Sequence, residues 1–144
     1  MTGPANPLVT LLEGAYARWD QTKGGSAREV LELFADNVEM RSVLSPIVGS
    51  RLAGVHRSRE EASDYFAALT EDWEMLHFEV DRFVADGDDV VMIGRCAFRH
   101  KLNGEEVATP KVDVWHFENG KATIFSEYFD TLGFATATGA AALV

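Results

Sequence analysis

The sequence predicts an α+β domain in which three helices precede a long antiparallel sheet. Apolar residues recur at three- and four-residue spacing in the first half of the chain, which is typical of helices. From His77 onward the side chains alternate in type, and three hairpin signals divide this region into four strand-like runs: Asp86-Gly87, Asn103-Gly104 and Asn119-Gly120. Connections this short join antiparallel strands and exclude parallel crossovers. We expect one domain over residues 1–144, with its core at about 8–134.

Capping signals place the three helices. Asn6-Pro7 opens the first, because asparagine accepts hydrogen bonds from free backbone N–H groups and proline is tolerated at the first helical position. Gly24-Gly25 is expected to end it. Ser26–Glu29 and Ser58–Glu61 each fit a capping box, so they predict the starts of the second and third helices.

The strands follow from alternation and turn residues. A short strand is expected around Val38–Val43, and a loop over Leu44–Arg57. The long strands are predicted at His77–Ala85, Val90–Leu102, Glu105–Phe117 and Lys121–Phe129. The tail Thr136–Val144 either is mobile or closes a pocket or a dimer.

Strand register puts two acidic residues among aromatic ones. A three-residue turn with Gly120 in the left-handed region sets Asp113 opposite Glu127, whereas a two-residue turn would point Glu127 to the other face. We prefer the three-residue turn because it keeps the aromatic residues together on one face: Trp115, Phe117, Phe125 and Phe129.

The hairpin at Asn103-Gly104 determines which residue pairs with Asp113 on the neighbouring strand. A two-residue turn at Asn103-Gly104 pairs Gly94 with Asp113, which leaves a gap next to the carboxylate. A bulge at Pro110 would shift this register by one residue.

A carboxylate that faces a core costs several kcal/mol if it stays ionised and unpaired. Asp113 is therefore either a functional group with a raised pKa or a structural carboxylate paired with Lys111 or Arg95 on a solvated face. Glu127 either shares a proton with Asp113 or forms a salt bridge at a dimer face.

Composition narrows the function classes. With 23 acidic and 13 basic residues the formal charge is −10, which disfavours nucleic-acid binding. The single cysteine, Cys96, excludes an internal disulfide and a cysteine-based metal site, and the four histidines lack metal-ligand spacing. No metal, cofactor or membrane partner is expected, since no phosphate-binding loop, signal peptide or long apolar run occurs. The expected location is the cytoplasm.

The pattern of elements resembles the nuclear transport factor 2-like cone fold, a cone-shaped barrel of helices on a curved sheet, and within it the SnoaL-like and ketosteroid isomerase-like group. The resemblance covers about residues 8–134 and rests on four local motifs besides Gly54: Leu33–Asn37, Val84–Asp88, Trp115–Lys121 and Glu127–Asp130. Members of this superfamily include isomerases, cyclases, dehydratases, hydrolases and non-catalytic domains.

The resemblance implies roles for some residues. Tyr16 and Asp113 match the tyrosine and the aspartic acid that form the oxyanion hole of ketosteroid isomerase. Its general base corresponds to Ser42, beside Arg41, and neither residue can act as a carboxylate base.

The similarity to limonene epoxide hydrolase is also partial. Glu127 matches its acidic residue near the end of the last strand, but Met40 and Ser42 replace the residues that hold its water. Its arginine–aspartate pair falls near Arg95 and Ala97, which face away from the pocket in our register.

Together these features predict a cofactor-independent acid/base enzyme, of isomerase, dehydratase or cyclase type, that acts on a small hydrophobic molecule. The expected catalytic residues are Asp113, Tyr16 and Glu127. The expected substrate-binding residues are Trp115, Phe125, Phe129, Trp19, Met40, Ser42, Phe98 and His56. The alternative is a non-catalytic ligand-binding or dimerisation module. A homodimer is expected through the outer sheet face, where an apolar stripe contains Val112, Val114, Ile124 and Tyr128.

Overall fold

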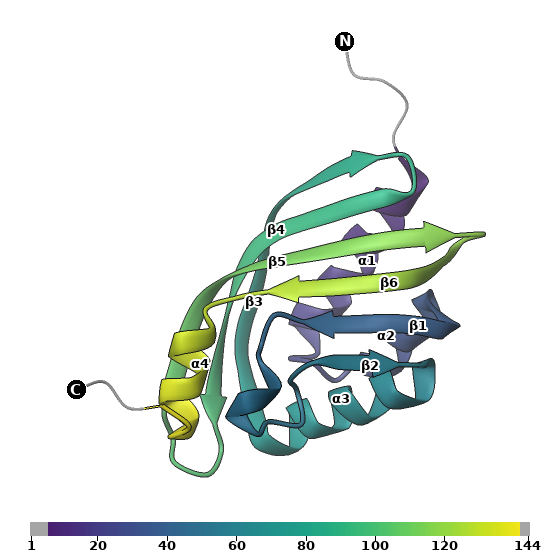
Figure 1. Ribbon diagram of the computed structural model, residues 1–144. Coiled ribbons are helices and arrows are strands. Elements are labelled where there is room, and N and C mark those ends of the chain that lie inside the picture. The colour runs from purple at the N-terminus through teal and green to yellow at the C-terminus, as the bar shows by residue number, and fades with distance from the viewer. Residues whose placement is uncertain (1–5, 142–144) are drawn as a thin grey trace.

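The computed structural model describes residues 6–141 and confirms the predicted α+β class (Figure 1). The elements run in chain order as α1 (Pro7–Gln21), α2 (Ala27–Leu33), β1 (Phe34–Ser42), the short 3₁₀ helix η1 (Pro46–Val48), β2 (Val55–Arg57), α3 (Arg59–Asp72), β3 (Trp73–Asp86), β4 (Asp89–His100), β5 (Glu106–Glu118), β6 (Lys121–Tyr128) and α4 (Thr131–Thr138).

The six strands form one strongly curved sheet with the order β2-β1-β6-β5-β4-β3 (Figure 1). β1 pairs with β6 in parallel, and every other neighbouring pair is antiparallel. α1, α2 and α3 lie along the concave side of the sheet, and α4 lies beside the turn that joins β4 to β5 (Figure 1). The apolar core fills the space between the helices and the concave face.

The first and third helices begin where their caps predict. The Asn6 side chain accepts a hydrogen bond from the backbone N–H of Leu8. The Ser58 hydroxyl accepts one from the N–H of Glu61, and the Glu61 carboxylate accepts one from the N–H of Arg57. These contacts satisfy N–H groups that have no partner within the helix.

The predictions for the end of α1 and the start of α2 differ in outcome. α1 ends at Gln21, and Gly24, with a φ of 82°, closes this end by donating its N–H to the carbonyl oxygen of Trp19 at 2.9 Å, as predicted. Ser26 makes no side-chain capping hydrogen bond, so the capping box predicted for α2 is not formed.

Three short elements were missed in the sequence. The predicted loop over Leu44–Arg57 contains η1 and β2, and β2 exists because it pairs with β1, with Met40 opposite His56. The start of the predicted tail belongs to α4, whose N-cap Asp130 accepts a hydrogen bond from the N–H of Gly133. Residues 142–144 of that tail lie outside the described residues.

The register between β4 and β5 differs from the prediction by two residues. Met92, not Gly94, pairs with Asp113, and Gly94 pairs with Lys111. The turn after His100 is longer than two residues, so each residue of β5 pairs with a β4 residue two positions earlier than predicted. A shift of two residues leaves each side chain on its predicted face. Gly94 is required for a different reason: a Cβ atom there would lie 2.1 Å from the carbonyl oxygen of Glu79.

The hairpin between β5 and β6 has the predicted register at Asp113, but its turn differs from the predicted one. Asn119 and Gly120 form a two-residue turn, both with positive φ, and not the three-residue turn that we preferred. A bulge then leaves Thr123 unpaired, because Phe117 pairs with Ala122 and His116 with Ile124. The extra residue restores the side-chain parity, so Asp113 lies opposite Glu127 as predicted.

Candidate functional site

Three charged side chains meet on the concave face of the sheet. Asp113 on β5 and Glu127 on β6 occupy opposite positions, and Lys111 precedes Asp113 by two residues on the same face. Alternate residues of a strand point to the same side, so strand geometry fixes this grouping. The residues are 8%, 3% and 4% exposed for Lys111, Asp113 and Glu127, so this is a buried charged cluster.

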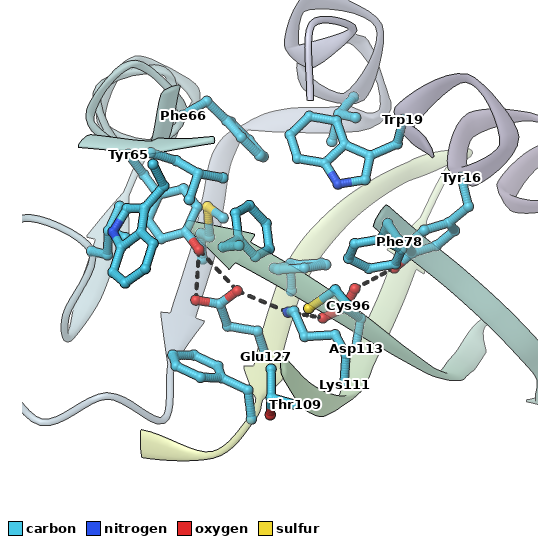
Figure 2. A pocket seen from close by; sticks show the side chains of 18 of the residues that line it. Tyr16, Trp19, Tyr65, Phe66, Phe78, Cys96, Thr109, Lys111, Asp113 and Glu127 are labelled. Carbon is cyan, nitrogen blue, oxygen red and sulfur yellow. Dashed lines mark hydrogen bonds and ion pairs between the residues drawn. The ribbon is translucent and has the colours of Figure 1, made fainter. Parts of the chain in front are cut away.

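The Lys111 ammonium bridges the two carboxylates (Figure 2). Its Nζ atom lies 2.5 Å from Asp113 Oδ1 and 2.9 Å from Glu127 Oε2. Hydrogen bonds between ionised groups are shorter and stronger than neutral ones, and a buried charge is tolerated when it is paired in this way.

Two tyrosines extend the cluster from the helices. Tyr16 on α1 donates from its hydroxyl to Asp113 Oδ2 at 2.5 Å, and it accepts a hydrogen bond from Trp115 Nε1 at 2.9 Å. Tyr65 on α3 donates to Glu127, with its hydroxyl 2.7 Å from Oε1 and 2.9 Å from Oε2. A continuous line therefore runs from Tyr16 through Asp113, Lys111 and Glu127 to Tyr65 (Figure 2).

Burial shifts the pKa values of the ionisable groups in this hydrogen-bonded line. Desolvation raises the pKa of Asp113 above its ordinary value, although the charge of Lys111 and the hydrogen bonds from Lys111 and Tyr16 oppose the rise. Desolvation would lower the pKa of Lys111, but the attraction of Asp113 and Glu127 outweighs it and raises that pKa, so the amine stays protonated.

The phenols and the thiol nearby remain neutral for the same reason. Burial, followed by the neighbouring carboxylates, raises the pKa of both Tyr16 and Tyr65 well above the ordinary value for tyrosine. Burial raises the pKa of Cys96 to about 12, so this thiol is not a nucleophile at neutral pH.

The cluster forms the polar part of an otherwise apolar cavity of about 100 Å³. An engineered core cavity of about 150 Å³ holds one benzene molecule, so a cavity of this smaller size limits a ligand to about one ring. Its apolar and aromatic lining is drawn from all parts of the fold: Ala15, Trp19, Val30, Met40, Leu52, Phe66, Leu69, Trp73, Phe78, Phe98, Val107, Trp115, Phe125, Phe129 and Phe134.

Most of the residues predicted for the site surround this cavity. The three expected catalytic residues line it, together with six of the expected substrate-binding residues: Trp19, Met40, Phe98, Trp115, Phe125 and Phe129. The aromatic rings contact one another; the rings of Trp115 and Phe125, for example, lie 4.8 Å apart at their centroids.

Ser42 and His56 lie outside this lining, which corrects their expected placement. Ser42 pairs with Glu127 across β1 and β6, but its hydroxyl accepts a hydrogen bond from the N–H of Leu44 at 3.1 Å. The ring of His56 forms a T-shaped pair with the ring of Tyr65, which lines the cavity, and its Nε2 atom lies 3.1 Å from the carbonyl oxygen of Arg51.

Sequence reasoning missed two members of the site. Lys111 was considered only as a partner of Asp113 on a solvated face, whereas it pairs with Asp113 inside the cavity. The two-residue spacing was the available signal, because it requires a common face. Tyr65 belongs to the apolar side of its helix, and no sequence signal showed that α3 brings its hydroxyl to Glu127. Arg95 pairs with Glu79 and Asp81 on the exposed side of the sheet.

Within residues 6–141, no group of three or more histidine, cysteine or acidic side chains is arranged to hold a metal ion. In the same part of the chain, no helix has the length and apolar content needed to cross a membrane.

Comparisons with known proteins show what this chain is similar to. The family model for the SnoaL-like domain matches residues 12–125. An NTF2-like protein of unknown function from Burkholderia pseudomallei K96243 has a similar structure, with a TM-score of 0.77 and 22% identity over 89% of this chain and 94% of that one. An NTF2-like protein from Burkholderia xenovorans LB400 gives a TM-score of 0.73 and 26% identity, covering 90% of this chain and 94% of the other. The comparison with curated proteins gives no match.

Proposed function

The chain belongs to the family of SnoaL-like domains, and from this premise we propose that it is a cofactor-independent acid/base enzyme of isomerase, dehydratase or cyclase type. Its substrate is a small hydrophobic molecule held in the cavity. One observation carries this proposal: a hydrogen-bonded line of ionisable groups, from Tyr16 to Tyr65, is buried in a cavity that is otherwise apolar.

Asp113 and Tyr16 provide the acid side of this chemistry. When Asp113 holds a proton, its O–H can donate to the Tyr16 oxygen, which already accepts a hydrogen bond from Trp115. The phenol proton of Tyr16 is then released to a carbonyl or hydroxyl oxygen of the substrate. A donor aimed at developing negative charge in a dry site lowers the barrier by several kcal/mol.

Glu127 provides the base. Its carboxylate is held by Lys111 and by Tyr65, and it lies opposite Asp113 across the strand pair. In this arrangement one carboxyl group accepts a proton from carbon while the other, through Tyr16, stabilises the enolate that forms. Lys111 keeps the two carboxyl groups from repelling each other, because its charge lies between them.

One observation favours the non-catalytic alternative. Each oxygen and nitrogen of the charged cluster already has at least one hydrogen-bond partner within the protein, so none of these atoms requires a ligand. A closed network of this kind is expected in a module that binds a ligand through apolar contacts or uses the fold only for assembly.

Hydrogen–deuterium exchange of the methyl protons of acetophenone, followed by NMR in heavy water, distinguishes these functions. Acetophenone has one aromatic ring and an enolisable carbonyl group, which suits the cavity. We expect the protein to accelerate the exchange above the buffer rate, and Glu127→Gln and Tyr16→Phe to slow it. If the wild-type protein binds acetophenone and exchanges it no faster than these variants, the binding module is the correct function.

A further inference from the structure

With both carboxyl groups ionised, the buried charged cluster has one more negative charge than positive charge. It contains the carboxyl groups of Asp113 and Glu127 and the single ammonium group of Lys111. Lys111 is the only basic residue in the cavity lining within residues 6–141. An uncompensated buried charge is unfavourable, so the site gains free energy when one further positive charge enters it.

The hydrogen-bonding capacity of the cavity wall shows the same imbalance. Asp113 accepts two hydrogen bonds and Glu127 accepts three, whereas an ionised carboxylate can accept about four. Tyr16 and Tyr65 both use their only proton within the cluster. Lys111 uses two of its three N–H groups, so the wall offers more acceptors than donors to a ligand.

Aromatic rings surround the remaining space. The Lys111 Nζ atom lies 5.8 Å from the centroid of Phe129 and 6.0 Å from that of Phe125, which shows that ring faces already stabilise one cation here. Other rings of the lining, including Trp19 and Phe78, have no cationic partner among the described residues. The overall charge of −10 also attracts cations to the molecule.

We propose that the cavity selects hydrophobic ligands that carry a protonated amine, with the ammonium group beside Lys111 at the acceptor positions of Asp113 and Glu127 that remain free and the apolar part against the aromatic lining. This inference rests on the proposed function in one respect, which is that the cavity admits a small hydrophobic ligand. Lys111 does not act as an anchor for anions, because both of its neighbours already neutralise it.

Burial also raises the pKa of Asp113, so a proton and the ammonium group of a ligand compete for the same carboxylate. The groups that face this proton are Tyr16 on α1, Tyr65 on α3, Cys96 on β4, Lys111 on β5 and Glu127 on β6. Binding of an ammonium group therefore releases up to one proton from the cluster.

Isothermal titration calorimetry with three matched ligands tests the proposal: phenethylamine, phenethyl alcohol and phenylacetate at pH near 7. These molecules share one ring and nearly the same length, and they differ in charge. We expect phenethylamine to bind at least about tenfold more tightly than the alcohol, which corresponds to about 1.4 kcal/mol, and phenylacetate to bind more weakly than either. The proposal is overturned if phenylacetate binds as tightly as phenethylamine, or if millimolar phenethylamine does not bind.

Two further readouts make the result specific to the cluster. Asp113→Asn and Glu127→Gln should each bring the affinity for phenethylamine close to that for the alcohol, whereas Asp36→Asn, at a side chain that is 93% exposed, should change neither. In the wild-type protein, the affinity for the amine should also rise as pH rises through the titration range of Asp113, because a proton and the ammonium group compete for this carboxylate, while the affinity for the alcohol should not. An amine affinity that falls as pH rises through this range overturns the proposal.

This experiment is separate from the test of catalysis. A protein that prefers amines but does not exchange acetophenone protons retains the charge preference and loses the enzymatic function. A protein that exchanges acetophenone protons but prefers phenylacetate retains the enzymatic function and loses the charge preference.

Discussion

Asp113 and Glu127 lie opposite each other on neighbouring strands, and one ammonium group, that of Lys111, joins them. Each carboxylate also accepts a hydrogen bond from a tyrosine of a different helix, Tyr16 for Asp113 and Tyr65 for Glu127. The helices therefore contact the sheet through the site itself. Both the stability and the chemistry of the protein should depend on the charge balance of this cluster.

Replacement of Lys111 by methionine should destabilise the protein strongly at neutral pH. The substitution leaves two buried carboxylates without a cation, and removal of one partner of a buried ion pair costs about 3–5 kcal/mol. The loss should be smaller near pH 4, because the carboxyl groups can take up protons. Urea unfolding at both pH values measures the effect. Lys23→Met is the matched control, since this side chain is 48% exposed and its loss should cost less than about 1 kcal/mol. Equal, small effects of the two substitutions would show that the buried cluster does not need its cation.

Asp113→Asn should change how stability depends on pH. The folded-state pKa of Asp113 is raised above its ordinary value of 3.8, so the stability it contributes is fully present below that value and is lost as pH rises through the folded-state pKa. The variant lacks this loss, so its free energy of unfolding relative to wild type should rise between pH 4 and pH 7. Chemical unfolding at the two pH values measures the difference, and a constant or falling difference would contradict the raised pKa.

Tyr16→Phe should reduce proton transfer more than it reduces stability. Loss of one donor to a developing oxyanion typically slows a reaction by about a hundredfold to a thousandfold. The stability cost should be about 1–3 kcal/mol, because Trp115 Nε1 and Asp113 each lose a buried partner. Exchange rates for acetophenone and urea unfolding give the two values. Tyr128→Phe is the control, because this side chain is 47% exposed and should affect neither. A normal exchange rate in Tyr16→Phe would remove Tyr16 from the chemistry.

Replacement by alanine should destabilise the protein at Gly94 and stabilise it at Gly14. Gly94→Ala places a Cβ atom 2.1 Å from the Glu79 carbonyl oxygen, so the backbone of β3 or β4 must move. Overpacking of this kind typically costs about 1–3 kcal/mol. Gly14 lies within α1 with no heavy atom within 4 Å of the added carbon, so Gly14→Ala should stabilise by about 0.5–1 kcal/mol. Thermal unfolding of both variants measures these effects, and a tolerated Gly94→Ala would contradict the close approach of the two strands.

We propose that two copies of the chain associate through the outer face of the sheet. Half-buried apolar side chains form a continuous patch there, across β4, β5 and β6: Val91, Ile93, Val112, Val114 and Ile124. Val114→Glu should produce monomers in sedimentation velocity experiments at micromolar concentration, since a carboxylate cannot be buried there without a partner. Leu11→Glu, on an exposed position of α1, should leave the association unchanged. A wild-type protein that sediments as a monomer would rule out the dimer.

The side-chain parity of the strands and the pairing of Asp113 with Glu127 were predictable from the sequence, but the register of β4 against β5 and the lengths of the turns were not. The register of β4 against β5 differed by two residues, yet Asp113 kept its face because a shift of two preserves parity. The turn between β5 and β6 was predicted one residue too long, and the unpaired Thr123 compensated. Bulges and turn lengths are set by packing of the whole sheet, which the local sequence does not contain.

The prediction of the site was limited because the sequence does not show which helix side chains contact which strand side chains. Tyr16 was predicted as a partner of Asp113 from its place on the apolar face of α1 and the family resemblance, and the structure confirms the contact. Tyr65 occupies a comparable position on α3, but its contact with Glu127 depends on the angle at which the helix crosses the sheet. Lys111 was considered only as a partner of Asp113 on a solvated face; lysines are seldom buried, and two carboxylates hold this one inside.

An NMR titration of the Asp113 carboxyl carbon, with and without phenol as a mimic of an enol, tests the central claim most directly. We predict a titration midpoint clearly above the ordinary range for aspartic acid, because burial raises its pKa, and a further change when phenol binds. A midpoint near the ordinary value of about 3.9 that does not respond to phenol would contradict the account. Asp113 would then be a solvated structural carboxylate, and the cavity would not be a site of acid/base chemistry.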